Sequence, residues 1–395
     1  METLRFLLTS SFFPPYHVGG DAVHVKYLAE ELVKRGHEVH VLHSLDAYYV
    51  KNRGRPEKKG VQGVYTYPIK TMLSLSAYEA YMLGFSSTVV RTFDRLIGYI
   101  RPDVVHHHNI SLLGYVLLKK RGNYVNLYTA HDYWLICQNN NLLKYGSKIC
   151  DEGSCFLCTL LRRRPPQLWR YSGKFKEIVE NETDCLIAPS DYLRMKMLEK
   201  YKLRAVTIPN FVPEPPSNIE LTKKYSSFFI YAGVLEIHKG VMVLLEVYKE
   251  IADKIDEKLF IVGEGSMKRK LARYINRHGL NSKVFLLGRV KRNTLLSLLK
   301  SAKALIIPSM WPENCPLIAL EAISLGTPVI ASNKGGLPEI VNKINKKLVY
   351  NSITELKQIL LDLDKEKYDR DKLKKIYAKH YSPQIYLESY LKLVR

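Results

Sequence analysis

The sequence predicts an α/β protein made of two Rossmann-like domains, each with a parallel sheet that helices cover on both faces. Short apolar runs rich in β-branched residues recur along the chain, and each is followed by a turn and a helical pattern. Such fully apolar strands are typical of parallel sheets buried between helices. The length of 395 residues also exceeds what one hydrophobic core usually serves, which favours two domains.

The predicted strands fall into two sets, one for an N-terminal domain at residues 1–209 and one for a C-terminal domain at residues 210–383. The first set comprises Leu4–Thr9, Glu38–His43, Asp103–His108, Tyr124–Ala130, Cys185–Ala188 and Val206–Ile208. The second set comprises Phe228–Ala232, Leu259–Val262, Val284–Leu287, Ala304–Ile307 and Pro328–Ala331. A proline-rich segment at residues 209–217 separates the sets and is predicted to be a linker. The last helical pattern, within residues 384–395, could pack back on the N-terminal domain.

The strand ends indicate where a ligand would bind. In open parallel sheets, ligands bind outside the carboxyl ends of the strands. Two such domains joined by a proline-containing hinge would place both sets of strand ends around one crevice. We therefore expect an interdomain site.

Composition excludes several classes of protein. With 46% hydrophobic and 25% charged residues, the chain is typical of a soluble globular protein and is neither disordered nor collagen-like. The first residues lack the pattern of a secretory signal, and no apolar stretch reaches the roughly 20 residues that span a bilayer. A cytoplasmic protein without a transmembrane helix is therefore predicted. Only 5 glutamines, beside abundant Lys, Glu, Ile and Tyr, suggest a thermophilic source.

The positive charge is large and uneven. The net charge is +22, and residues 51–150 carry 14 basic against 5 acidic side chains, while residues 251–300 carry 12 against 4. Such a field attracts phosphate groups on nucleotides, nucleic acid or anionic lipid heads, and a solvated surface is the alternative. Charge alone does not choose among these partners.

The most informative stretch is residues 308–326, which follow a predicted strand. Pro316 suits the first turn of a helix, and that helix is apolar on all sides except for Glu321 and a serine. A buried carboxylate needs a partner, which could be a structural Arg or Lys or the hydroxyls of a ligand. The free amides at the helix start, including that of Leu317, would face an anion or sugar oxygens. Glu313 precedes the helix, so both glutamates can address a ligand that lies across its N-terminus.

The seven-residue separation of Glu313 and Glu321 in this context resembles the retaining glycosyltransferases of family 4, which have the two-domain GT-B fold. The likeness covers nearly the whole chain. Its further marks, weak singly and specific in combination, are Gly19-Gly20, Gly36 to Val39, His131-Asp132, Gly233 to Gly240, Gly263 to Gly265, and Gly335-Gly336 followed by Glu339.

The resemblance implies a reaction. It implies a metal-independent retaining glycosyltransferase that moves a hexosyl unit from a nucleotide diphosphate sugar to a hydroxyl of a glycan or lipid-linked acceptor. The donor would lie against the C-terminal domain, and the N-terminal domain would set acceptor specificity. The leaving phosphate would help to deprotonate the acceptor, and no protein nucleophile or catalytic cofactor is required.

The resemblance also implies roles for residues of the C-terminal domain. Glu313 would hydrogen-bond the hydroxyls of the donor sugar, and Glu321 would bind the ribose. Lys239 would supply a cation to the diphosphate, and Arg289 would contact the nucleotide base, although both could instead be surface cations. The sugar and phosphate would be supported by amides in the stretch Asn314, Cys315, Pro316 and Leu317.

In the N-terminal domain the resemblance implies that Gly19 and Gly20 approach the diphosphate and acceptor, and that His131 hydrogen-bonds a sugar hydroxyl. The other interpretations are a tight turn for the glycines and an ordinary core histidine for His131. Three histidines at residues 106–108 also end a predicted strand. Side chains alternate between the two faces of a strand, so the middle histidine points to the opposite face from the other two. A metal cluster is therefore not predicted there.

One departure from the family pattern keeps other functions open. Val234 stands where family members commonly carry an arginine just after the glycine, so one expected diphosphate ligand is missing. His238, Lys239 or a neighbouring arginine would have to replace it. A nucleotide-sugar epimerase, a sugar-phosphate synthase and a non-catalytic nucleotide-sugar-binding protein remain alternatives to the transferase.

Four cysteines lie close together in a loop-rich segment at residues 137–158. Cys137, Cys150, Cys155 and Cys158 form a C-x12-C-x4-C-x2-C pattern. Four thiolates could bind a structural zinc ion, an iron–sulfur cluster has related spacing, and disulfides are the rival in a thermophile. In each case the expected role is to hold the loop after His131, not to perform chemistry.

The segment from Arg162 to Tyr171 interleaves cations with aromatic residues. Together with the basic excess before it, this segment could dock the N-terminal domain on an anionic membrane that carries a lipid-linked acceptor. RNA binding uses the same residue types, but no recognised nucleic-acid module is visible, so nucleic acid is not expected as a partner. An exposed, ion-paired loop is the remaining interpretation.

Overall fold

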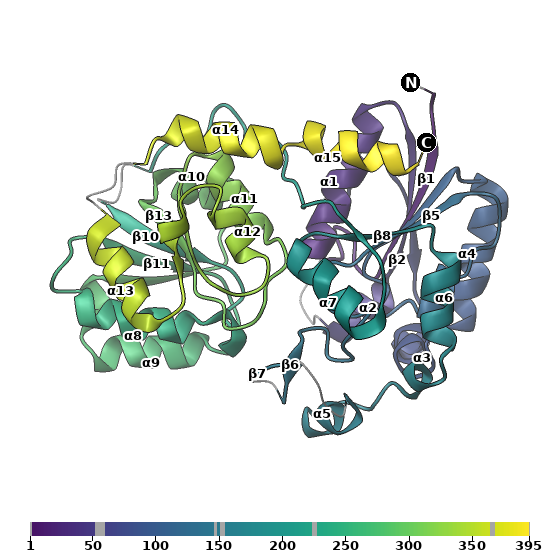
Figure 1. The fold of residues 1–395 in the computed structure, drawn as a ribbon, viewed down its shortest axis with the longest axis horizontal. Coiled ribbons are helices and arrows are strands. Elements are labelled where there is room, and N and C mark those ends of the chain that lie inside the picture. The colour runs from purple at the N-terminus through teal and green to yellow at the C-terminus, as the bar shows by residue number, and fades with distance from the viewer. Residues whose placement is uncertain are drawn as a thin grey trace. The chain divides into compact units, whose positions relative to one another are not determined.

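The computed structural model describes residues 2–51, 60–145, 148–150, 155–222, 227–363 and 368–394 (Figure 1). The chain divides into two compact units. The first unit is Met1–Ile208 together with Leu387–Arg395, and the second is Pro209–Tyr386. In the described ranges, no helix is both long enough and apolar enough to cross a membrane.

The first unit is built on a seven-stranded parallel sheet with the order β3-β2-β1-β4-β5-β8-β9. Its strands are β1 (Arg5–Ser10), β2 (Glu38–Ser44), β3 (Tyr65–Ile69), β4 (Val104–His107), β5 (Val125–Thr129), β8 (Cys185–Ala188) and β9 (Val206–Thr207). The α-helices are α1 (Gly20–Lys34), α2 (Leu45–Lys51), α3 (Leu75–Leu83), α4 (Ser87–Ile100), α5 (Cys155–Leu161), α6 (Lys174–Glu182) and α7 (Asp191–Tyr201). Short 3₁₀ helices are η1 (Met72–Ser74), η2 (Tyr115–Leu118) and η3 (Leu168–Tyr171), and an antiparallel pair is formed by β6 (Leu143–Lys144) and β7 (Lys148–Ile149).

The second unit is built on a six-stranded parallel sheet with the order β12-β11-β10-β13-β14-β15. Its strands are β10 (Phe228–Ala232), β11 (Lys258–Val262), β12 (Val284–Gly288), β13 (Ala304–Ile307), β14 (Val329–Ser332) and β15 (Val349–Tyr350). The α-helices are α8 (Val241–Ile251), α9 (Lys268–Arg277), α10 (Arg292–Ser301), α11 (Leu317–Ser324), α12 (Leu337–Val341), α13 (Ile353–Asp362), α14 (Arg370–His380) and α15 (Pro383–Tyr390). Short 3₁₀ helices are η4 (Ile237–Lys239), η5 (Leu280–Ser282) and η6 (Lys346–Leu348). Helix η8 (Leu391–Leu393) follows α15 and belongs to the first unit.

Burial explains why the central strands are apolar throughout. Every residue of β4, β10, β13 and β14 is buried, because helices cover both faces of each sheet. In the second unit, α8 packs with α13 on one face of the sheet, and α11 packs with α10 and α14 on the other (Figure 1). The predicted fold class of two parallel-sheet α/β domains is confirmed.

Two edge strands were absent from the sequence prediction. Strand β3 contains Pro68 and has mostly exposed side chains, so it lacks the apolar run by which a buried strand is found. Strand β15 has only two residues, Val349 and Tyr350, which pair with β14. Both strands lie at a sheet edge, where only one neighbour constrains the sequence.

The C-terminal helical pattern begins in the second unit and ends in the first. Tyr386 of α15 packs on Phe211, with ring centroids 4.6 Å apart, within the second unit. Tyr390 is fully buried in the first unit, where its hydroxyl lies 2.9 Å from Nδ1 of His106. The end of this helix is therefore part of the first unit's core.

Candidate active site

Glu313 follows β13 and is the centre of a buried polar cluster. The residue is 7% exposed, and its Oε1 accepts hydrogen bonds from Lys239 Nζ at 2.6 Å, Ser309 Oγ at 2.6 Å and Trp311 Nε1 at 2.8 Å. Burial alone would raise the pKa of Glu313, but the Lys239 ammonium and the three hydrogen bonds outweigh it and hold the pKa below its usual value. The carboxylate is therefore ionised at neutral pH.

Lys239 reaches Glu313 because of the turn that follows η4. Gly240 has a φ of 72°, and a Cβ there would overlap the carbonyl oxygen of Pro308. Only glycine allows the turn to pass this close to the end of β13. The ammonium also lies 4.8 Å from the centroid of the Trp311 ring, so the cation is held by a carboxylate and an aromatic face.

A pair of glycines, Gly335 and Gly336, fixes the backbone of Glu313. Gly336 donates its N–H to the carbonyl of Glu313 at 2.6 Å, and Gly335 forms an isolated parallel bridge with the same residue. Gly335 has a φ of 63°, and a Cβ there would overlap that carbonyl oxygen. The Gly335-Gly336 pair noted in the sequence thus holds the loop that carries Glu313.

The segment from Asn314 to Leu317 leads into α11. The helix begins at Leu317, with Pro316 at the N-cap, one residue later than the sequence pattern indicates. Asn210 donates its side-chain amide to the Cys315 carbonyl at 2.8 Å, which fixes the segment. Burial raises the pKa of the Cys315 thiol to about 12, so this thiol stays protonated and is not a nucleophile at neutral pH.

Glu321 has a protein partner that the sequence did not name. Its Oε2 lies 2.7 Å from Nη1 of Arg292 at the start of α10, and the Arg292 side chain is 45% exposed. The sequence left two kinds of partner open for this buried carboxylate, a structural Arg or Lys and the hydroxyls of a ligand. In the structure the partner is an arginine. No spacing rule could reveal it, because the pair depends on how α10 packs on α11.

The loop with the unusual valine lies beside a second glycine-containing loop. Val234 is 51% exposed, and its carbonyl accepts a hydrogen bond from the Tyr231 hydroxyl at 2.8 Å. Leu235 donates its N–H to the Glu264 carbonyl at 2.8 Å, which joins the two loops. Arg289 is exposed after β12, and its backbone N–H is hydrogen-bonded to the Glu264 carboxylate. Arg289 is thus anchored at the carboxyl end of the sheet.

In the first unit, His131 belongs to a buried cluster with His24 and His108. One ring nitrogen of each lies within 4.8 Å of the others, and Nδ1 of His108 lies 2.9 Å from Nε2 of His131. Burial lowers the pKa of all three imidazoles, that of His131 to about 3. All three are therefore neutral at pH 7 and can donate and accept hydrogen bonds or ligate a metal. Among the described residues, this is the one group of three or more His, Cys, Asp or Glu with that spacing.

The sequence pattern anticipated only part of this cluster. His106 in β4 and His108 just after the strand have ring centroids 4.0 Å apart, whereas Nδ1 of His107 lies 2.7 Å from Thr9 Oγ1. The triplet alone is therefore no ligand set. His24 was missed because its position inside α1 carries no local sign that it reaches the strand ends.

Gly19 and Gly20 precede a carboxylate at the start of α1. Asp21 is half-buried, and its Oδ2 accepts a hydrogen bond from Asn109 Nδ2 at 2.6 Å. The backbone N–H groups of Asp21 and Ala22 also bond this carboxylate. A phosphate at this helix start would have to share those amides with Asp21.

Asp132, which follows His131, organises the next loop. Its Oδ1 accepts the N–H of Trp134 at 2.8 Å, and its Oδ2 accepts the Asn140 amide at 3.1 Å. Burial raises the pKa of Asp132 to about 6. The same loop continues to Cys137, the first of the four clustered cysteines.

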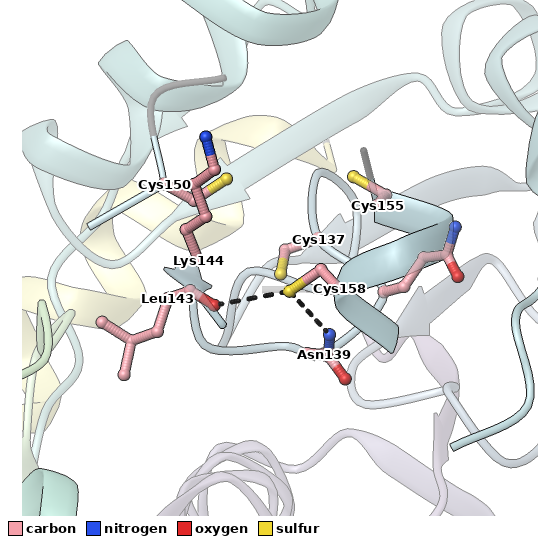
Figure 2. A pocket seen from close by; sticks show the side chains of 8 residues that line it. Cys137, Asn139, Leu143, Lys144, Cys150, Cys155 and Cys158 are labelled. Atoms are coloured by element: carbon pink, nitrogen blue, oxygen red, sulfur yellow. Dashed lines mark hydrogen bonds between the residues drawn. The ribbon is translucent and has the colours of Figure 1, made fainter. Parts of the chain in front are cut away.

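Cys137, Cys150, Cys155 and Cys158 line one small cavity in the first unit (Figure 2). All six cysteines of the chain have free thiols in the structure. The structure thus brings the four residues of the sequence pattern together, apart from Cys185 in β8 and Cys315 before α11.

Two family models match the chain. The model of Glycosyltransferase Family 4 matches residues 18–214, and that of Glycosyl transferases group 1 matches residues 216–380. The chain belongs to the family 4 glycosyltransferases. This glycosyltransferase is 26% identical over 360 residues to an uncharacterised glycosyltransferase of Methanocaldococcus jannaschii, over 88% of this chain and 85% of the relative.

Solved structures confirm the GT-B fold of this glycosyltransferase. Sucrose-phosphate synthase from Thermosynechococcus elongatus superposes with a TM-score of 0.72 at 17% identity, over 98% of both chains. The Anabaena protein HepE, crystallised in complex with UDP and glucose, superposes with a TM-score of 0.65 at 14% identity, over 99% of both chains. At these identities the likeness concerns the fold alone.

Proposed function

We propose that this glycosyltransferase transfers a hexosyl unit, with retention of anomeric configuration, from a nucleotide diphosphate sugar to a hydroxyl of a glycan or lipid-linked acceptor. The chemical step needs no metal in this proposal. The observation that carries it is the ion pair between Lys239 and Glu313 at the carboxyl end of β13. This pair combines a carboxylate for sugar hydroxyls with a cation for the leaving group.

Glu313 is suited to bind the donor sugar. The three hydrogen bonds from Lys239, Ser309 and Trp311 all end on Oε1. Oε2 of Glu313 therefore remains to accept hydrogen bonds from sugar hydroxyls. An ionised acceptor in a buried site binds a hydroxyl more strongly than a neutral one.

Lys239 is suited to stabilise the departing diphosphate. Its ammonium has three N–H donors, of which one bonds Glu313, and its side chain is 22% exposed. Negative charge grows on the diphosphate as the bond to the anomeric carbon breaks, so a fixed cation lowers the barrier. This cation compensates for the missing arginine at Val234.

The proposed bond changes need no protein nucleophile. The bond between the anomeric carbon and the phosphate oxygen breaks, and the acceptor oxygen forms the new bond on the same face of the sugar. The departing phosphate oxygen accepts the proton of the acceptor hydroxyl. His131, which is neutral, hydrogen-bonds a sugar hydroxyl in this scheme and transfers no proton.

Exposed apolar side chains of the first unit support a membrane-borne acceptor. Met72 and Leu73 of η1 are 78% and 80% exposed. The adjoining α3 is joined to the basic segment, because the Tyr81 hydroxyl donates to the Pro165 carbonyl at 3.1 Å and Trp169 Nε1 donates to the Tyr81 carbonyl at 3.0 Å. Apolar side chains beside cations are the combination that binds anionic membranes.

Sedimentation with lipid vesicles tests this docking. Vesicles that contain phosphatidylglycerol are expected to bind the protein, and vesicles of phosphatidylcholine alone are not. Charge reversal of the exposed Arg163 and Arg164 should reduce the binding, which should also fall as salt is raised. Equal binding to both kinds of vesicle, or none, would contradict the membrane part of the proposal.

Product analysis tests the reaction itself. The protein is incubated with UDP-glucose and with the corresponding GDP, ADP and dTDP sugars, together with glycan and lipid-phosphate acceptors. Release of the nucleoside diphosphate together with an α-linked product from an α-linked donor supports retaining transfer. An inverted product contradicts retention. An epimerised nucleotide sugar, a sugar phosphate, or binding without turnover would instead establish one of the alternative functions.

A further inference from the structure

Four cysteines from separate segments of the first unit converge on one cavity of about 20 Å³. Cys137 lies in the loop after β5, Cys150 follows β7, and Cys155 and Cys158 lie in α5 (Figure 2). Residues three apart on a helix share one face, which explains why α5 offers two thiols to the same cavity. A cavity of this size has room for a body about as large as one water molecule, which is enough for a single metal ion.

Hydrogen-bond donors lie beside two of the four sulfur atoms, those of Cys158 and Cys150. The N–H of Tyr145 lies 3.3 Å from Cys158 Sγ, and the side-chain amide of Asn139 lies 3.7 Å from the same atom. The ammonium of Lys200, from α7, lies 3.6 Å from Cys150 Sγ. Such donors stabilise thiolates in metal sites, where the outer partners orient the ligands and offset their charge.

We propose that Cys137, Cys150, Cys155 and Cys158 bind one Zn²⁺ ion as four thiolates in a tetrahedral structural site. Binding releases four protons, one from each thiol, and leaves a complex of net charge −2 beside Lys200. Four sulfur ligands in tetrahedral geometry are typical of structural zinc. No catalytic role is assigned to the ion, because no position would remain open for a substrate.

Binding requires a local contraction. A zinc–sulfur distance of about 2.3 Å sets neighbouring sulfur atoms about 3.8 Å apart in a tetrahedron. In the structure, no three of these four sulfur atoms lie within 4.8 Å of one another. The ion would therefore draw the sulfur atoms closer together and tie the three segments to one another.

The consequence of the ion is to fix a loop network next to Asp132. The Gln138 side chain accepts the N–H of Gln167 at 3.0 Å, and its amide donates to the Tyr171 hydroxyl at 2.8 Å. Asn140, on the same loop, donates to Asp132. Zinc would thus hold together the loop that follows His131 and the basic, aromatic segment after α5.

Metal analysis with thiol counting tests the proposal. The full chain is purified without chelators or added metal, and zinc is measured by mass spectrometry of the elements in the wild type, Cys137→Ser and Cys158→Ser. Cys185→Ser, outside the cluster, is the matched control. We expect about one zinc per chain in the wild type and the control, and less than about a tenth of that in the two cluster variants.

Three results would overturn the zinc site. The first is a metal-free wild type in which four of the six thiols do not react after denaturation, because those cysteines then form disulfides. The second is a metal-free wild type with all six thiols reactive. The third is zinc that persists in Cys137→Ser, which would place the ion elsewhere, for example at the His24, His108 and His131 cluster.

Cobalt substitution decides the question if the serine variants do not fold. Wild-type protein stripped of metal is titrated with Co²⁺ alone. Thiolate-to-cobalt charge-transfer bands together with the d–d bands of tetrahedral cobalt are expected, saturating at one equivalent and abolished by one equivalent of Zn²⁺. Spectra without charge-transfer bands would contradict thiolate ligation and overturn the proposal.

Discussion

Nζ of Lys239 lies 2.6 Å from Oε1 of Glu313, although 74 residues separate them in the sequence. The pair joins the end of η4 to the loop after β13, two segments that follow neighbouring strands of one parallel sheet. Strand order alone brings such segments to the same edge of the sheet. The pair is therefore a product of the topology, and its chemistry can be tested one residue at a time.

Replacing Glu313 by Gln is expected to lower kcat/KM by about 10² to 10³, because the neutral amide binds sugar hydroxyls less well and no longer balances Lys239. Steady-state kinetics with the best donor measure this loss, and thermal unfolding reports whether the fold is kept. Glu250→Gln, which breaks the exposed ion pair with Lys357, is the control and should be near wild type. Wild-type rates in Glu313→Gln would remove this residue from the proposed site.

Lys239→Ala is expected to reduce kcat by about 10²-fold or more and to change the donor KM less, since the diphosphate gains charge mainly in the transition state. The two parameters are separated by varying the donor at saturating acceptor. Lys374→Ala, at an exposed ion pair with Asp371, serves as the control. A higher KM with an unchanged kcat would instead show that Lys239 binds ground state and transition state alike.

Arg292→Met is expected to destabilise the protein by about 1 to 3 kcal/mol, because it leaves the buried Glu321 carboxylate without its charged partner. Chemical denaturation measures the free energy of unfolding in this variant and in Arg292→Met/Glu321→Gln. The double variant should recover part of the loss, since the unpaired buried charge is gone. If Glu321 also binds the ribose, nucleotide affinity will fall in the double variant and not in Arg292→Met.

The sequence predicted the class of fold and most strands because buried parallel strands leave continuous apolar runs. It also named Glu313, Lys239, Glu321 and His131 separately. It did not predict the Arg292 partner or the contact of His24 with His131, since both depend on how a helix packs against its neighbours. Patterns among residues that are close in the sequence do not show how a helix packs against distant parts of the chain. Edge strand β3 was missed for a related reason, because its exposed side chains follow no apolar run.

Stability is expected to fall in acid because of the histidine cluster. The folded-state pKa of His131 is about 3, well below the usual 6.5, so the folded protein keeps this ring neutral while the unfolded chain protonates it. Its contribution to stability is complete above pH 6.5 and is lost as the pH falls toward 3. His131→Asn should therefore make the unfolding free energy less dependent on pH between 4 and 6, by about 1.4 kcal/mol per pH unit.

Urea unfolding at several pH values measures that slope. His278→Asn is the control, at a partly exposed histidine after α9 whose pKa is lowered less than that of His131, and it should change the slope much less. Asp132 has the opposite effect on how the unfolding free energy depends on pH. Burial raises its pKa to about 6, so the folded protein binds this proton more readily than the unfolded chain does. Parallel slopes in the wild type and His131→Asn would show that the ring is not held neutral by the fold.

Removal of metal from the cysteine cluster is expected to lower the thermal midpoint by about 5 °C or more while the dissociation constant for the nucleotide changes little. The proposed ion links segments of the first unit, whereas the donor residues Glu313 and Lys239 belong to the second. Thermal unfolding and calorimetric titration with UDP, before and after chelation, separate the two effects. Chelation should leave Cys137→Ser unaffected and should still destabilise Cys185→Ser. If chelation weakened nucleotide binding by as much free energy as it removed from the stability of the fold, the result would show that the cysteine cluster affects donor binding.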